Sequence, residues 1–487
     1  MKRASYADLP DRFFARITPV PVAAPRLLKF NQDLCAELGL TICDLDAAGL
    51  AGIFSGNVVA AEAAAIAMAY AGHQFGHFVP QLGDGRAILL GEALDRGGVR
   101  RDIQLKGSGR TPYSRGGDGR AALGPVLREY LVSEAMHALN ISTTRALAAV
   151  TTGETVVREA VLPGAIVTRV AASFVRVGTF QYFAARDDVE AVRLLADYVI
   201  ERLFPHLKTV QLPYLALLRA VSDAQAALIA SWMHVGFIHG VMNTDNMAVS
   251  GETIDFGPCA FMDAYDKAMV FSSIDRHGRY AYGNQPHAAL WNLARFAETL
   301  LALIDARPER AVELASAELA TFSPRFAEQW LAGMRRKLGL SSAEDSDTSL
   351  AEDLLDTMQR NQADFTRTFR ALAAAAEGAA GLAQARALFA NPHDFDEWAS
   401  RWQARLARDA VDPSARAAAM RLVNPLFIPR NHRIEQVIEA AVERDDLGPF
   451  AELSAVLAEP YRDQPGFEAY ADPPRPAERV LQTFCGT

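Results

Sequence analysis

The pattern of apolar and polar residues predicts strands in the first part of the chain and helices in most of the remainder. Residues 101–106 predict a strand that ends in a lysine, and two more β-rich runs follow at 148–158 and 165–170. The Pro163-Gly164 dipeptide between these two runs is typical of a turn. Further along, the apolar positions follow a helical period, most clearly in the alanine-rich run 214–235.

We expect an α+β fold in which a β-rich lobe precedes a helical lobe, because a chain of 487 residues is too long for one small core. Residues 1–70 are expected to form a helical N-terminal extension, which includes an alanine-rich run at 58–71. The remaining divisions are a β-rich N-lobe at 71–180, a helical C-lobe core at 181–290, and a helical C-terminal region at 291–487.

Composition is that of a soluble globular protein, with 50% hydrophobic and 22% charged residues. The net charge of −9 argues against nucleic-acid binding as the main function. No apolar run is long and uncharged enough to span a bilayer, and the N-terminus resembles neither a secretory signal nor an organelle presequence. We therefore expect a cytoplasmic protein that binds neither nucleic acid nor membrane, and we expect it to be a monomer.

Two short segments carry the candidate chemistry, residues 239–246 (His-Gly-Val-Met-Asn-Thr-Asp-Asn) and 255–257 (Asp-Phe-Gly). They resemble the catalytic loop H-R-D-x-x-x-x-N and the D-F-G motif of protein kinases, which supply a base and metal ligands. On this pattern Asn246 and Asp255 are hard oxygen ligands for Mg²⁺.

The loop differs from a kinase at the position of the catalytic aspartate, which falls on Val241 and can accept no proton. An acidic residue, Asp245, does stand immediately before Asn246. A kinase-like fold with altered chemistry is one interpretation. The other is an Asx-rich turn in which these side chains cap backbone groups, and the loop by itself supports both equally.

A buried ion pair is predicted between the strand that ends at Lys106 and the helix that follows. Proline at position 125 begins that helix, on which Glu129 shares a face with apolar residues. A glutamate on an apolar face needs a cation, and Lys106 would complete the lysine–glutamate pair that holds nucleotide phosphates in kinases. The alternative places Glu129 at the edge of the stripe, in solvent.

Glycines and arginines complete the candidate site. Gly83 and Gly85 would let the backbone approach an anion beside Arg86, although Asp-Gly is also a common hairpin turn. Arg169 and Arg176 can meet at one anion only if the chain bends between them, at residues 171–172. They would then act as phosphate clamps; otherwise they are surface ion-pair partners.

Several segments together resemble the selenoprotein O (YdiU-type) family across nearly the whole chain. They are residues 70–77 (YAGHQFGH), 81–86 (QLGDGR), 104–115 (QLKGSGRTPYSR), 239–246, 254–258 (IDFGP) and 424–432 (NPLFIPRNH). The resemblance implies a protein-kinase-like two-lobed fold with the N-lobe binding nucleotide. It also implies a pseudokinase that binds ATP in a reversed orientation and transfers AMP to Ser, Thr or Tyr hydroxyls of protein substrates, releasing pyrophosphate.

The resemblance also assigns roles to individual residues. It implies Mg²⁺ or Mn²⁺ at Asn246 and Asp255, and Asp245 as proton acceptor. The implied nucleotide contacts are Gly83, Gly85, Arg86, Lys106, Asp118, Gly119, Arg169, Arg176 and Asp255. A conventional kinase that uses Asp245 as a displaced base, and a non-catalytic ATP-binding scaffold, remain as alternatives.

The cysteines suggest one further hypothesis. Cys35, Cys43, Cys259 and Cys485 lie far apart in sequence and form no C-x-x-C motif, which excludes a zinc ribbon and fits a reducing compartment. Members of the family keep a cysteine or selenocysteine near the C-terminus, where this chain has Cys485. A disulfide between Cys485 and Cys259 would fasten the tail beside the metal site and lower activity. It requires α-carbons within roughly 7 Å of each other.

Overall fold

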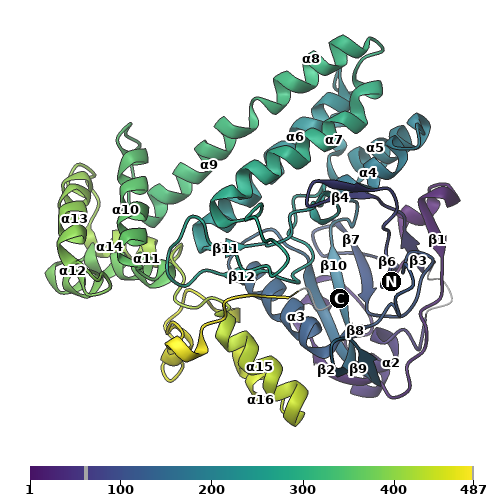
Figure 1. Ribbon diagram of the computed structural model, residues 1–487, viewed down its shortest axis with the longest axis horizontal. Coiled ribbons are helices and arrows are strands. Elements are labelled where there is room, and N and C mark those ends of the chain that lie inside the picture. The colour runs from purple at the N-terminus through teal and green to yellow at the C-terminus, as the bar shows by residue number, and fades with distance from the viewer. Residues whose placement is uncertain (60–63, 485–487) are drawn as a thin grey trace.

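The structure is a computed structural model that describes residues 1–59 and 64–484. Its largest feature is an antiparallel sheet in the order β1-β3-β6-β7-β10-β9-β2, with the short β8 paired to β10 (Figure 1). The strands are β1 (Phe14–Arg16), β2 (Arg26–Phe30), β3 (Ile66–Met68), β6 (Ala87–Leu94), β7 (Arg100–Lys106), β8 (Ala121–Ala122), β9 (Arg145–Val157) and β10 (Val161–Ala171).

Both faces of this sheet are buried, because successive residues of its central strands, which point to opposite faces, both enter an apolar core. Ile88 and Leu90 pack with α1 (Gln32–Glu37) and α2 (Ala47–Phe54), whereas Leu89 enters the core that contains α3 (Leu123–Ala138). Side chains alternate between the two faces of a strand, so the near-continuous apolar run of β6 is what a two-sided core requires.

Helices make up most of the chain after the sheet (Figure 1). The long helices α6 and α9 run alongside each other, and α15 and α16 pack on α3. The bounds are α4 (Val177–Ala184), α5 (Val189–Leu203), α6 (Pro213–Val235), α7 (Gln285–Ile304), α8 (Pro308–Leu319), α9 (Phe322–Lys337), α10 (Asp347–Asn361), α11 (Phe365–Ala375), α12 (Ala379–Arg386), α13 (Pro392–Leu406), α14 (Pro413–Arg421), α15 (Asn431–Arg444) and α16 (Gly448–Ala458).

Two small sheets hold the loops that matter for function. β11 (Phe237–Ile238) pairs with β12 (Ala260–Phe261), so the 239–246 loop and the Asp-Phe-Gly segment both lie between two paired strands. The second sheet is a hairpin of β4 (Gly72–Gln74) and β5 (His77–Val79).

The architecture confirms several predictions and corrects others. It is a mixed α/β fold with an antiparallel sheet, and the predicted strand ending at Lys106 and the helix over 214–235 are present as β7 and α6. The predicted turn at Pro163-Gly164 is wrong: both residues lie inside β10, and the chain reverses at 158–160 instead. Pairing with β9 outweighs the local turn preference of a Pro-Gly dipeptide.

The N-terminal segment also differs from its prediction. The helix expected at 58–71 is wrong for Ile66–Met68, which forms β3 between β1 and β6; residues 60–63 lie outside the described part of the chain. Residues 1–70 thus add strands to the main sheet. Residues 66–68 form a strand and not a helix because they pair with β1 and β6, and the periodicity of the sequence does not reveal these partners.

Cys35 and Cys43 form a disulfide, with their Cα atoms 5.9 Å apart. The bond closes the short loop that follows α1, and the expectation that the cysteines stay reduced is therefore wrong for this pair. Among residues 1–59 and 64–484, none of the helices has both the length and the apolar character that crossing a bilayer demands.

Candidate active site

A cleft of about 750 Å³ opens between the sheet, α3 and the two motif loops. Its walls come from the ends of β6, β7 and β10 and from the segments that follow β11 and precede β12. All the residues predicted as site residues line it: Gly83, Gly85, Arg86, Lys106, Asp118, Gly119, Arg169, Arg176, Asp245, Asn246 and Asp255.

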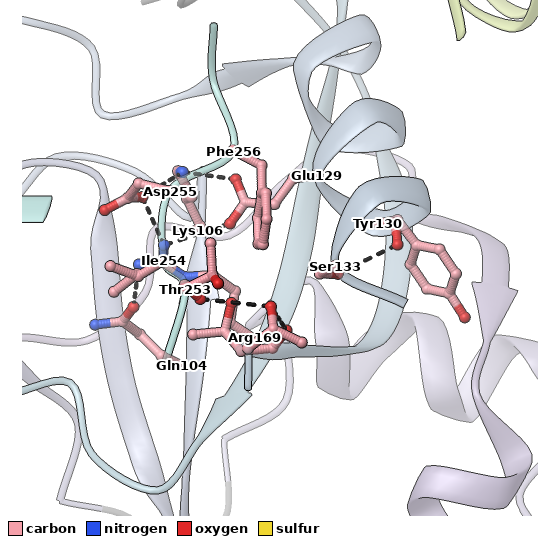
Figure 2. A network of polar contacts seen from close by, with 12 residues as sticks. Gln104, Lys106, Glu129, Tyr130, Ser133, Arg169, Thr253, Ile254, Asp255 and Phe256 are labelled. Carbon is pink, nitrogen blue, oxygen red and sulfur yellow. Dashed lines mark hydrogen bonds and ion pairs between the residues drawn. The ribbon is translucent and has the colours of Figure 1, made fainter. Parts of the chain in front are cut away.

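The floor of the cleft is a cluster of ion pairs around Lys106 (Figure 2). The Lys106 Nζ lies 2.6 Å from Glu129 Oε2 and 2.7 Å from Asp255 Oδ1, so the predicted pair with Glu129 is confirmed. Arg169 Nη1 lies 2.7 Å from the same Asp255 oxygen and 3.3 Å from Glu129 Oε1. Strand geometry produces this meeting, because Gln104 and Lys106 share one face of β7 and β10 pairs Arg169 with Gln104.

The two arginines converge as the predicted bend requires. β10 ends at Ala171, and Arg176 stands at the N-terminal cap of α4. From there its Nη1 reaches Asp255 Oδ2 at 3.1 Å and donates to the Asp245 carbonyl at 2.9 Å, while its guanidinium lies 4.6 Å from the Tyr70 ring centroid. One carboxylate thus receives Lys106, Arg169 and Arg176 together.

Asp255 is held ionised by this surrounding charge. Burial favours the neutral acid, but Lys106, Arg169 and Arg176 outweigh it and hold the pKa of the Asp255 carboxyl well below its usual range. Its backbone has a φ of 63°, an uncommon conformation for a residue other than glycine. Such local strain persists where surrounding contacts fix it, and here those contacts are the ion pairs.

Asp245 lies in a single 3₁₀ turn, Thr244–Asn246, beside the β4–β5 hairpin. Its Oδ2 accepts a hydrogen bond of 3.3 Å from Gln74 Nε2, whereas its Oδ1 is buried without a partner among the described residues. Burial, against the nearby charge of Arg176, raises the pKa of this carboxyl to about 6. A carboxylate that lines a cleft and has a raised pKa is suited to accepting a proton.

Asn246 is oriented by the loop itself. Its Nδ2 donates to the Val241 carbonyl at 3.0 Å, so the opposite side of the amide, Oδ1, is the atom left for a cation. Among the described residues, no group of three or more His, Cys, Asp or Glu side chains is arranged to hold a metal. The donors that line the cleft, an amide oxygen and the carboxylate of Asp255, are nevertheless the hard ligands that Mg²⁺ or Mn²⁺ accepts.

Two glycines that line the cleft allow backbone turns that a residue with a side chain could not adopt. Gly83 has a φ of 84°, and a Cβ there would lie 2.3 Å from the Tyr113 ring. Gly119 has a φ of 68°, and its Cβ would lie 2.1 Å from the Gly109 carbonyl oxygen. Only glycine fits either position without displacing its neighbour, so these segments stay close enough to the cleft for backbone contact with a ligand.

Comparison with known proteins is consistent with this geometry. A family model described as protein adenylyltransferase SelO matches residues 2–458. The protein nucleotidyltransferase YdiU of Rhizobium rhizogenes is 65% identical over 483 residues, which cover 99% of this chain and 96% of the relative. Its namesakes from a Bradyrhizobium strain and from Rhizobium meliloti are 64% and 62% identical, each over 99% of this chain and 98% of the relative.

The chain belongs to the SelO family. It is accordingly an enzyme of the nucleotidyltransferase class. The family resemblance inferred from the sequence is confirmed.

Sequence reasoning missed several residues of this SelO-family cleft. Asp84 lies at its base, accepts hydrogen bonds from Gln104 and from the Met68 backbone, and has a pKa raised to about 6 by burial. Gln104 in turn accepts from Arg169 and fixes the orientation of its guanidinium. The QLGDGR and QLK strings contain both residues, but Asp84 lies in the loop before β6, and only folding brings it against Met68 of β3 and Gln104 of β7.

An ion pair that the sequence did not indicate joins the glycine-rich 115–120 segment to the turn between β9 and β10. Asp118, a predicted nucleotide contact, lies 2.8 Å from Arg158 Nη1, at the end of the β9–β10 hairpin. Arg120 and Arg115 also line the cleft. The residues that line the cleft include more cationic than acidic side chains. The chain as a whole carries a net charge of −9, so this local excess of positive charge favours an anionic ligand in the cleft.

Cys485 lies outside the described residues, so its bond to Cys259 stays a prediction. The described tail does reach the right place: the Thr483 hydroxyl donates to the Pro258 carbonyl, next to Cys259, at 2.5 Å. In this conformation the Cys259 thiol donates to the Phe256 carbonyl at 3.3 Å, and burial raises its pKa to about 12. A protonated, buried thiol is a poor nucleophile, so disulfide formation requires the loop to open.

Proposed function

We propose that this SelO-family enzyme transfers AMP from ATP to the hydroxyl of a Ser, Thr or Tyr in a protein substrate and releases pyrophosphate. The observation that carries the proposal is the convergence, in one cleft, of a cationic cluster with the carboxylate of Asp245. The cluster suits a polyphosphate, and the carboxylate suits the deprotonation of an acceptor hydroxyl.

The same proposal includes a kinase-like arrangement of two lobes, with 71–180 as the nucleotide-binding lobe. It is supported by the strand-lysine and helix-glutamate pair of Lys106 and Glu129, followed in order by the Asn246 loop and the Asp255 segment. Val241 occupies the place of a kinase's base. Asp245, four residues later, would take over proton removal from a different position, which favours a different phosphorus as the point of attack.

In the proposed reaction, the Asp245 carboxylate accepts the proton of the acceptor hydroxyl, and the hydroxyl oxygen attacks the α-phosphorus of ATP. The bond from the α-phosphorus to the bridging oxygen breaks, and pyrophosphate leaves with the electron pair. Lys106, Arg169 and Arg176 lie where they can neutralise the phosphates, and such fixed charges stabilise a transition state without reorganising.

Asn246 and Asp255 would hold Mg²⁺ or Mn²⁺, which would neutralise charge on the phosphates as the leaving group departs. A cation at this position would compete with Lys106 and the two arginines for the Asp255 carboxylate. Guanidinium groups displaced from Asp255 would then be available to bind the nucleotide.

The acceptor's gain in mass tests the proposal. The enzyme is incubated with ATP, a divalent cation and a mixture of proteins, and modified proteins are weighed by mass spectrometry. A gain of one AMP is expected. A gain of one phosphate would identify a conventional kinase, and unmodified proteins despite ATP binding would identify a scaffold.

A further inference from the structure

Beside the cleft, the β4–β5 hairpin, the 274–280 turn and α7 form a surface that the proposed reaction does not use. We name it the hairpin surface and define it by Phe78, Ile274, Arg279 and Trp291. Phe78 and Ile274 are 39% and 55% exposed and give this surface its apolar part. His73 joins the parts, with its ring 5.0 Å from that of Phe78 and 5.2 Å from that of Trp291.

The hairpin surface is bound directly to the turn that carries Asp245. The His73 backbone donates to Thr244 Oγ1 at 2.7 Å, and the Phe75 backbone donates to Asn243 Oδ1 at 2.9 Å. Gln74, between them, donates to the Asp245 carboxylate, and Ile274 itself lines the cleft. A chain lying on this surface would be within one side chain of the proposed base.

Arg279 gives the surface a positive charge that forms no ion pair with any of the described residues. Its guanidinium lies 4.7 Å from the Trp291 ring centroid, and its Nε is buried with no hydrogen-bond partner in the described part of the chain. The nearest acid in sequence, Asp275, is occupied, because its two oxygens accept the backbone N–H groups of Arg279 and Tyr280. Arg295, which also lies over Trp291, differs in that it is paired with Glu298 at 2.6 Å.

We propose that the hairpin surface docks the acceptor protein, and that it takes a segment with a carboxylate close to the residue that receives AMP. The inference rests on the proposed function, because it assigns the acceptor side of the same reaction. A guanidinium held over an aromatic ring is preorganised to bind a carboxylate, and the apolar side chains of the segment would contact Phe78 and Ile274. Because the chain as a whole has a net charge of −9, most of its surface disfavours an acidic segment, and the positive charge of Arg279 would favour such a segment at this place.

Peptide binding tests the docking surface. Two labelled peptides of equal length carry one tyrosine each, flanked by glutamates in one and by lysines in the other, and their affinities are measured by fluorescence anisotropy. The wild type is expected to prefer the acidic peptide, and Arg279→Glu to shift the preference toward the lysine peptide by about five-fold or more, given the strength of exposed ion pairs. Arg279→Lys keeps the charge and should keep the preference.

Arg310→Glu on α8 is the matched control, because Arg310 is 42% exposed and lies on a helix away from the cleft (Figure 1). It makes the same change in net charge and should leave the preference as in the wild type. Equal binding of both peptides, binding of neither, or a preference that Arg279→Glu does not change would each overturn the docking surface. AMP transfer to the protein mixture, measured on the same preparations, is independent: its absence contradicts the proposed function instead.

Discussion

At the scale of single residues, Asp245 and Lys106 line the same cleft but differ in how completely their charged groups are paired. Lys106 is engaged by two carboxylates, whereas Asp245 keeps a buried oxygen without a partner. A charge held between two partners fixes the position of its neighbours, whereas a carboxylate with one long hydrogen bond and a raised pKa can accept a proton. This contrast separates a binding role for Lys106 from a chemical role for Asp245.

Asp245→Asn tests the chemical role. The amide fills the same space and keeps the contact with Gln74, but it cannot accept a proton. We expect the rate of AMP transfer to fall by about a hundred- to ten-thousand-fold, the usual contribution of a general base. ATP affinity, measured by calorimetry, should stay near the wild-type value. Loss of ATP binding would show that Asp245 is a metal-binding or structural residue.

Lys106→Ala tests the binding role. Removing the ammonium group leaves Glu129 with Arg169 alone and takes one cation away from Asp255. We expect most activity to be lost, together with ATP affinity, in contrast to Asp245→Asn. Lys208→Ala, which removes an exposed surface pair with Glu201, is the control and should leave both unchanged. Full activity in Lys106→Ala would make its pair with Glu129 purely structural.

At the scale of elements, α6, which leads into the 239–246 loop, packs closely along α9. A Cβ on Gly333 of α9 would lie 1.9 Å from the His234 ring, so the absence of a side chain at that position lets the helices meet. His234 Nε2 donates to the Trp330 carbonyl at 2.9 Å. Burial lowers the pKa of His234 to about 4, because the charged imidazolium would lose water there.

This histidine should make stability depend on pH. Since its folded-state pKa of about 4 lies below the unfolded value of about 6.5, its contribution is complete above pH 6.5 and is lost as pH falls toward 4. At pH 5 the loss should be about 1–2 kcal/mol in the free energy of unfolding. His234→Gln keeps a donor for Trp330 but does not titrate, so denaturation at pH 7.5 and pH 5 should show a smaller acid loss in the variant. Equal losses in both proteins would contradict this assignment.

The elements also show what the sequence could predict. Lys106 and Glu129 were predictable, because strand alternation placed the lysine and the apolar face of one helix placed the glutamate. The sequence predicted that Arg169 and Arg176 could meet only if the chain bends between them. The end of β10 at Ala171 provides this bend. Strand β3, the turn after β9 and the Cys35–Cys43 bond were not predictable, because each depends on partners distant in sequence or on a precise local approach. Asp84 was missed for the same reason: its burial comes from the sheet.

At the scale of the whole molecule, residues 430–431 fasten the C-terminal helices to the active-site loops. The Asn431 side chain donates to the Phe261 carbonyl at 2.8 Å and accepts from its N–H at 3.2 Å, so it clamps β12. Arg430 is completely buried, with Nη1 2.6 Å from both Asp263 and Asp364. The NPLFIPRNH string thus connects α15 with β12 and with the start of α11.

Arg430→Met should be strongly destabilising, because it leaves two carboxylates without their cation. Breaking a buried ion pair by removing one partner typically costs about 3–5 kcal/mol in the free energy of unfolding. Arg421→Met, which removes a surface pair with Glu377, should cost no more than about 1 kcal/mol. Urea denaturation of the two variants gives the comparison. Similar unfolding midpoints would show that the Arg430 cluster does not stabilise the connection.

The central claim is that the cleft directs attack at the α-phosphorus of ATP, and positional labelling tests it most directly. Acceptor proteins are incubated with the enzyme and with ATP labelled either in the α- or in the γ-phosphate, and label in protein is counted beside released pyrophosphate. Only the α-label is expected to enter protein, in proportion to released pyrophosphate, and Asp245→Asn should abolish nearly all of this incorporation. Incorporation of the γ-label without pyrophosphate release would contradict attack at the α-phosphorus.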